Sequence, residues 1–137
     1  MVLVDTGAFV ALFNSQDPYH QYCYNISKNL HEPLVTTVPV LTEAFHLLSD
    51  SKGSDALKQV IIKGGVNLWF LNDDTLSLAL KLMEKYKDCP MDFADASLVV
   101  AAQKLKCYKI FTVDRNDFSV YRIQVGHHYK SFEILGT

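Results

Sequence analysis

The chain has 137 residues, of which 49% are hydrophobic and 20% charged, and its formal net charge at pH 7 is −2. This balance excludes a disordered chain, and the length suits one domain, so we expect residues 1–137 to form a single domain. No apolar run approaches the roughly 20 residues of a membrane span, and the N-terminus lacks the basic start and the cleavage site of a secretion signal.

The first half of the chain alternates short apolar runs with helical patterns. In order, it predicts a strand at 2–4, a helix at 8–13, a helix from Pro18, a strand at 34–37, a helix from Pro39 and a helix at 54–62. In the helix from Pro18, Tyr22 and Ile26 form the inward stripe. Gly64-Gly65 is expected to end the sixth segment.

The second half continues the alternation. It predicts a strand at 66–71, a helix from a cap at 72–74 to about 87, an apolar helix from the break at 89–92 to about 105, a strand at 109–113 and a fifth strand at 132–135. Leu76, Leu80 and Met83 have helical spacing. The alternation predicts an α/β fold, a three-layer α/β/α sandwich with a central, mostly parallel sheet of four to five strands. In such folds the site lies at the carboxyl ends of the strands.

Four acidic residues, Asp5, Glu43, Asp95 and Asp114, follow predicted strands or lie on helices beside them, so this fold would gather them at one edge. Each has a simpler explanation. Asp5 is a natural helix cap, Glu43 suits an exposed helix position, and Asp114 suits a turn. Asp95, between alanines, is the hardest to explain in this way.

Two further acids are weaker candidates. Asp92 precedes Asp95 by three residues and is expected to cap the helix, with a second role at the site as the alternative. Asp117 is either an outer ligand or a turn cap. Thr112 either orients a carboxylate or is an ordinary strand residue.

Gathered carboxylates repel one another unless cations lie among them, and oxygen ligands suit Mg²⁺ or Mn²⁺. Such ions support phosphoryl chemistry, so the pattern favours a metal-dependent nuclease. The net charge permits this: without the six site acids, 15 − 6 = 9 acids face 13 Lys and Arg, which leaves +4. The metal candidates are Asp5, Asp95 and Asp114, with Glu43, Asp92 and Asp117 as additional ones.

Candidate substrate-binding residues near these acids are Thr6, Thr112, Arg115 and Arg122. Lys109, Lys130, Tyr121 and Tyr129 are further cationic and stacking candidates for RNA, with ordinary surface charge and core aromatics as the alternative. His127 and His128 are expected to be a surface or loop pair. The cysteines Cys23, Cys89 and Cys107 are odd in number and lack metal spacing, which favours reduced thiols in a cytoplasmic protein and no zinc site.

Nearly the whole chain resembles the PIN-domain family, of the kind that includes VapC-type toxins. The matching stretches are Leu3-Val4-Asp5-Thr6, Thr42-Glu43-Ala44, Met91-Asp92-Phe93-Ala94-Asp95-Ala96-Ser97-Leu98-Val99 and Phe111-Thr112-Val113-Asp114-Arg115-Asn116-Asp117-Phe118. The resemblance implies a Mg²⁺- or Mn²⁺-dependent ribonuclease with Asp5, Glu43, Asp95 and Asp114 as its acidic quartet and Asp117 as an accessory. It also implies a homodimer and, for toxin members, a small antitoxin partner.

Other functions remain to be weighed. A housekeeping RNA-processing nuclease or a non-catalytic RNA-binding module would fit the same resemblance. The Asp5-Thr6-Gly7 triplet matches an aspartic protease, but that class requires a mostly β fold. A phosphatase of the haloacid dehalogenase type lacks its second Asp, because position 7 is glycine.

Overall fold

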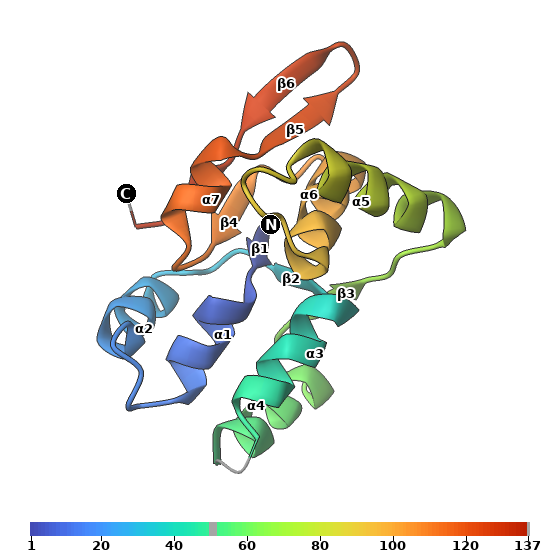
Figure 1. Cartoon of the computed structure of the whole chain (residues 1–137). Helices are drawn as coiled ribbons and strands as arrows, with labels where there is room; N and C mark the ends of the chain where they lie inside the picture. The colour runs from blue at the N-terminus through green and yellow to red at the C-terminus, as the bar shows by residue number, and fades with distance from the viewer. Residues whose placement is uncertain (50–51, 137) are drawn as a thin grey trace.

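A central parallel sheet organises the structure, a computed structural model that describes residues 1–49 and 52–136. Its strands are β1 (Val2–Val4), β2 (Leu34–Thr37), β3 (Asn67–Trp69), β4 (Lys109–Phe111) and β7 (Glu133–Ile134). They pair in the order β3-β2-β1-β4-β7, and every pair is parallel. Figure 1 shows the first four of these strands side by side. The expected parallel sheet is therefore confirmed, and all its carboxyl ends point to one edge.

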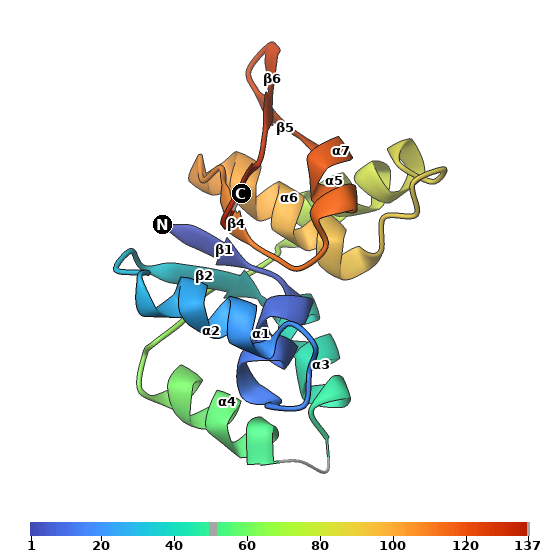
Figure 2. The same cartoon turned by 90° about the vertical axis from the view of Figure 1, so that its left-hand side faces the viewer.

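Helices cover both faces of this sheet. They are α1 (Thr6–Phe13), α2 (His20–Lys28), α3 (Val38–Leu47), α4 (Lys52–Ile62), α5 (Asp73–Lys85), α6 (Phe93–Leu105) and α7 (Arg115–Val120). In Figure 2, α1, α2 and α4 lie below the strands, and α5, α6 and α7 lie above them. Helix α3 contacts both α1 and α6, so it joins the two outer layers beside the sheet. None of the helices in the described ranges has the length and apolar character to cross a bilayer.

Helix α6 is the centre of the core. Every residue from 94 to 102 is buried, and most of them are Ala or Val. Small side chains allow close approach to the sheet and to α5. The buried Ser97 hydroxyl donates to the Ala94 carbonyl and shares a 2.6 Å hydrogen bond with the Thr37 hydroxyl. This contact ties α6 to the end of β2.

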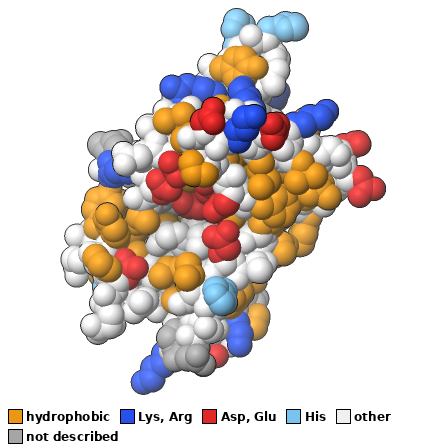
Figure 3. Space-filling view, in the orientation of Figure 1, with side chains coloured by type: hydrophobic (Ala, Val, Ile, Leu, Met, Phe, Trp, Pro, Cys, Tyr) orange, Lys and Arg blue, Asp and Glu red, His pale blue; other side chains and the backbone are white. Residues whose placement is uncertain are grey.

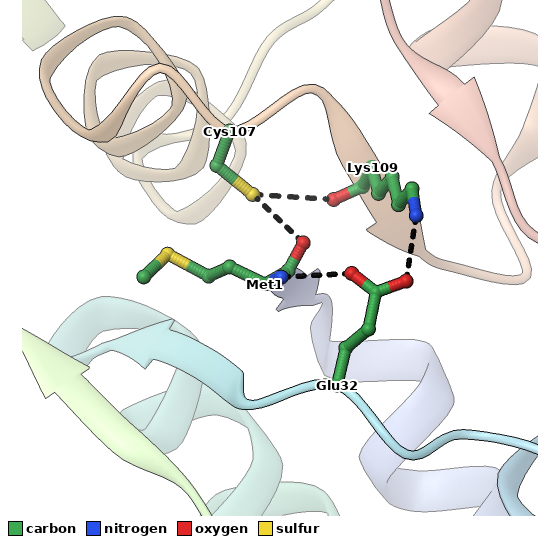
Figure 4. A network of polar contacts seen from close by, with 4 residues as sticks. All are labelled: Met1, Glu32, Cys107 and Lys109. Atoms are coloured by element: carbon green, nitrogen blue, oxygen red, sulfur yellow. Dashed lines mark hydrogen bonds and ion pairs between the residues drawn. The ribbon is translucent and has the colours of Figure 1, made fainter.

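The opposite edge of the sheet is closed by charges. Figure 4 shows Glu32 accepting from the Met1 ammonium at 2.8 Å and from Lys109 Nζ at 2.6 Å, while the Cys107 thiol faces the Met1 carbonyl. The hydrogen bonds from Lys109 and the N-terminus lower the pKa of Glu32 to about 2. Because these groups are exposed, they stabilise the fold little, and their main effect is to align the chain segments that meet at this edge.

The segment after β4 contains elements that were not predicted from the sequence. Residues 114–131 form α7 and a hairpin of β5 (Arg122–Val125) and β6 (His128–Ser131), none of which was predicted. The hairpin projects beyond the helices in Figures 1 and 2. Its tight turn carries Gly126 at φ +61, a backbone angle that favours glycine.

Other elements are shifted or shorter than expected. Helix α2 begins at His20 rather than Pro18, β3 spans only Asn67–Trp69, and β4 ends at Phe111, three residues before Asp114. Leu76 and Leu80 are exposed although their spacing suited a core-facing stripe. Tyr22 and Ile26 do pack against the core.

A substitution at Gly53 tests the packing between α4 and α1. A Cβ at this buried position would collide with the backbone oxygen of Phe13. Helix propensity alone favours Ala over Gly by about 1 kcal/mol, but a backbone atom cannot move aside as a side chain can. We therefore expect Gly53→Ala to lower the free energy of unfolding by about 1–3 kcal/mol in urea denaturation, while the neighbouring Ser54→Ala changes it little. An unchanged or raised midpoint for Gly53→Ala would contradict the packing.

Candidate functional site

An acidic hollow of about 290 Å³ opens at the carboxyl edge of the sheet. Its lining residues are Asp5, Thr6, Gly7, Glu43, Pro90, Asp92, Asp95, Val113, Asp114 and Asp117. All six acids proposed from the sequence are in this set. In Figure 3, Asp and Glu side chains gather at the centre of this face. None of the described residues that line the hollow is Lys, Arg or His.

Asp5 is the most enclosed of these carboxylates. It follows β1 directly and caps α1, because its Oδ1 accepts from the Thr6 N–H at 2.8 Å. Its Oδ2 accepts from the Thr112 hydroxyl, also at 2.8 Å. Burial raises the pKa of Asp5 to about 6, the two hydrogen bonds oppose this rise, and the charges of Asp114 and Asp92 add to it. The cap and the site roles weighed for Asp5 are thus compatible.

Asp95 lies in the first turn of α6 and is only 8% exposed. The Tyr121 hydroxyl donates to its Oδ2 at 2.9 Å. Burial, followed by the charges of Asp5 and Asp92, raises the pKa of Asp95 to about 8, and the bond from Tyr121 opposes that rise. Asp92 caps the same helix by accepting from the Asp95 N–H at 2.8 Å, as predicted.

Of the two roles weighed for Tyr121, the structure shows the core aromatic, because the residue is fully buried and has no face for an RNA base. Burial and the nearby Asp95 raise its pKa, so the phenol remains a proton donor to that carboxylate. Nothing in the sequence pairs Tyr121 with Asp95, which lies 26 residues earlier. The contact depends on α7 and the hairpin, which the sequence did not predict.

Thr112 connects the carboxylate of Asp5, which follows β1, to the backbone of Asp114, which caps α7. Its hydroxyl donates to Asp5 and accepts from the Asp114 N–H at 2.9 Å. Asp114 then caps α7 by accepting from the Asp117 N–H at 3.2 Å. A side-chain hydrogen bond to Asp114, then burial, raises the pKa of Asp117.

Glu43 reaches the hollow from α3 and is half-buried. Burial, followed by the charge of Asp92, raises its pKa, and the approach of the Thr6 hydroxyl opposes this. That hydroxyl is itself buried and has no partner within 3.5 Å in the parts of the chain that the structure describes. A buried polar atom without a close partner, directed at a polar hollow, is costly unless a bound group satisfies it.

The arginines proposed for substrate are occupied elsewhere. Arg115 donates to the Gly136 carbonyl at 3.0 Å and lies over the Tyr22 ring. The Arg122 guanidinium donates to the Ser119, Val120 and Tyr121 carbonyls, which end α7. Both arginines therefore stabilise the local backbone. Thr6 lines the hollow, and Thr112 supports it by donating a hydrogen bond to Asp5.

The donor chemistry of the hollow fits a hard divalent cation. Six carboxylates surround it, and bound positive charge would offset both the burial and the neighbouring negative charges that raise the pKa values of Asp5 and Asp95. Within residues 1–49 and 52–136, no three His, Cys, Asp or Glu side chains are already disposed as a ligand cage. The carboxylates therefore surround the hollow, but their oxygens do not converge on a single position.

The Asp-Thr-Gly triplet has a packing explanation. A Cβ at Gly7 would lie 2.5 Å from Val113 Cγ2. Glycine therefore allows the start of α1 to pack closely against the segment that leads to Asp114. Asp5 caps a helix beside a parallel sheet, which excludes the mostly β fold of an aspartic protease.

Comparisons with known proteins agree with this geometry. A family model described as PIN domain matches residues 2–123. Ribonuclease VapC26 of Mycobacterium tuberculosis is 28% identical to this chain over 124 residues, or 88% of this chain and 92% of the relative.

Two solved structures share the fold. One is VapC20 of Mycobacterium tuberculosis, described as a toxin that cleaves the sarcin-ricin loop, with a TM-score of 0.78, 19% identity and coverage of 85% of this chain and 92% of that chain. The other is a toxin–antitoxin complex from Klebsiella pneumoniae, with a TM-score of 0.69, 16% identity and coverage of 88% and 92%.

The raised pKa values predict how stability depends on pH without metal. In the folded chain, Asp5 and Asp95 keep protons that they release at about pH 3.8 when unfolded. Their favourable contribution is therefore complete below that pH and is lost as pH rises through about 6 for Asp5 and about 8 for Asp95. We expect the thermal midpoint in EDTA to fall from about pH 5 to about pH 8.

Asp95→Asn should flatten this fall, because it removes the carboxyl group whose pKa is raised to about 8, further than that of Asp5. Asp55→Asn, an exposed acid paired with Lys58 on α4, should leave the fall unchanged. A midpoint that rises over the same pH range in the parent chain would contradict the assignment of these buried acids.

Proposed function

Because the chain belongs to the PIN domain family, we propose that it is an endoribonuclease that depends on Mg²⁺ or Mn²⁺ and hydrolyses RNA phosphodiester bonds. The observation that carries the proposal is the convergence of six carboxylates on one hollow at the carboxyl edge of the sheet. The relative named ribonuclease VapC26 supports RNA as the substrate. Residues 1–137 would act as one nuclease domain.

Asp5, Asp95 and Asp114 would hold the metal ion, with Glu43, Asp92 and Asp117 beside them. A bound divalent ion supplies an activated water and polarises a phosphate oxygen. The protein side chains prepare the ligands: Thr112 fixes one oxygen of Asp5, and Tyr121 fixes one oxygen of Asp95. Both hydroxyls also hold the pKa of their carboxylate below the value that burial alone would set.

Glu43 suits the transfer of a proton. It is the only one of the six acids that comes from α3, and its raised pKa places it nearer to neutral pH than an ordinary Glu. A general base or acid works best when its pKa lies near the working pH. Glu43 would therefore position the attacking water and take its proton.

The biological role is a further part of the proposal. The similarity to VapC26 and to a toxin–antitoxin complex supports the toxin component of a toxin–antitoxin pair, held inactive by a small antitoxin in the cytoplasm. A homodimer is the expected assembly. A housekeeping RNA-processing nuclease and a non-catalytic RNA-binding module are the alternatives, and the cleavage assay below excludes the second if activity is found.

Neutralising the buried ligands tests the function. We expect Asp5→Asn and Asp95→Asn each to abolish Mn²⁺-dependent RNA cleavage by the purified protein, with a native circular dichroism spectrum, because each removes a charged ligand and preserves shape. EDTA should stop the parent enzyme. The exposed Asp55→Asn serves as the matched control and should retain parent activity. Full activity in both site variants would remove the proposal.

Tyr121→Phe tests the support given to Asp95. The phenylalanine keeps the packing against Tyr86 and Phe118 but loses the hydrogen bond that lowers the pKa of Asp95. Since a ligand must be deprotonated to bind metal, the acid limb of the profile of kcat/KM against pH should move to higher pH. Activity should recover in alkaline buffer, which a merely misfolded variant would not show. An unmoved acid limb would argue against this role, and Tyr24→Phe on α2 is the control.

A further inference from the structure

A second hollow lies between the hairpin and the helices beneath it. It measures about 230 Å³ and is lined by Lys81 and Lys85 of α5, Gln103 of α6, and Gln124 and Tyr129 of the hairpin, with two leucines of α5 between them. We call this set of residues the hairpin pocket. Its lining carries positive charge, two amides and one aromatic ring, in contrast to the acidic hollow.

The two lysines are not neutralised by the protein. They lie four residues apart on one face of α5, an arrangement in which like charges destabilise a helix. In the ranges that the structure describes, neither has a carboxylate within 4.0 Å. Residues 118–132 contain no Asp or Glu. In Figure 3, several Lys and Arg side chains lie below the projecting hairpin and above the acidic centre, with Asp and Glu side chains between some of them. An anion bound here would remove the repulsion between Lys81 and Lys85.

Tyr129 adds a surface for stacking. Its side chain is 55% exposed, and Lys85 Nζ lies 4.7 Å from the centre of its ring. A ring beside an ammonium group suits a nucleotide, because the base stacks on the ring while the phosphate meets the cation. Gln124 Nε2 donates to the Gly126 carbonyl at 3.4 Å, which leaves its second N–H and its carbonyl oxygen for a ligand. Together with the Gln103 amide, these groups supply donors and acceptors that match the edges of an unpaired base.

The hairpin pocket is connected to the acidic hollow through the fold. Gln103 follows Asp95 by eight residues on α6, a rise of about 12 Å along the helix. At the base of the hairpin, the Tyr86 hydroxyl accepts from the Arg122 N–H, and the Tyr86 ring packs edge-to-face on Tyr121, the partner of Asp95. A nucleic acid strand that spans a few nucleotides would therefore reach both places.

We propose that the hairpin pocket binds a nucleotide of a single-stranded RNA away from the bond that is cut, with Tyr129 stacking on the base and Lys81 and Lys85 binding phosphate. This inference rests on the proposed ribonuclease function and extends it. The pocket supplies the cations that the acidic hollow lacks and that Arg115 and Arg122, engaged with backbone carbonyls, do not provide.

Binding measured without cleavage tests the proposal. The parent protein and its variants are titrated in EDTA with a short single-stranded oligoribonucleotide of mixed sequence, and fluorescence anisotropy reports the affinity. Tyr129→Ala should weaken binding roughly 5- to 150-fold, whereas Tyr129→Phe keeps the ring and should bind like the parent. Lys81→Ala and Lys85→Ala should each lower the slope of log affinity against log salt by about 0.7.

A matched control exists on α2, where Lys28 Nζ lies 5.1 Å above the ring of the exposed Tyr24. Replacing both by alanine should change neither the affinity nor the salt slope. Equal losses at the two pairs, or no loss at Tyr129 and the two lysines, would overturn the proposal. So would polyglutamate binding that needs the lysines but not Tyr129, because it would identify an acidic peptide as the occupant.

Cleavage assays separate this inference from the function on which it rests. RNA binding that needs Tyr129, in a protein that never cleaves RNA with Mn²⁺, would remove the nuclease proposal and keep the pocket. Cleavage of the same oligoribonucleotide that is indifferent to Tyr129 and both lysines would keep the nuclease and remove the pocket.

Discussion

The rest of the structure depends on how negative charge is held at the carboxyl edge of the sheet. Three of the acids, Asp5, Asp92 and Asp114, are also the N-caps of α1, α6 and α7. The ends of three helices therefore direct backbone N–H groups and the positive ends of their dipoles toward one hollow. This partly offsets the repulsion among the carboxylates without neutralising them. The same residues start the helices and form the site, so fold and chemistry constrain each other here.

The balance at this edge explains why the buried acids differ. Asp5 accepts two hydrogen bonds and faces the charges of Asp114 and Asp92. Its pKa rises less than that of Asp95, which accepts one side-chain hydrogen bond from Tyr121 and faces three neighbouring charges. Hydrogen bonds favour the charged form, and burial opposes it. Burial therefore makes ionisation of both carboxylates costly, and nearby positive charge would reduce that cost.

The sheet, most helices and the gathering of the six acids were predictable because apolar runs and caps are local patterns, and because parallel strands end at one edge. Helix α7 and the hairpin were missed, since residues 114–131 have no clear period and their turn depends on Gly126. The engagement of Arg122 with the end of α7 and the burial of Tyr121 follow from those missed elements. The exposure of Leu76 and Leu80 has another cause. Helical spacing shows that residues share one face of a helix, but it does not show whether another element covers that face.

The two outermost strands of the sheet are short. Strand β3 has three residues and β7 has two, so each edge strand offers only a few unpaired backbone N–H and C=O groups. Short rims resist extension by a strand from another chain, a common route to unwanted polymerisation. Recognition of a peptide by β-augmentation needs a longer free border than either provides. A protein that binds this molecule would therefore contact side chains of the surrounding helices or the projecting hairpin. At such surfaces, shape and chemistry determine which partner is bound.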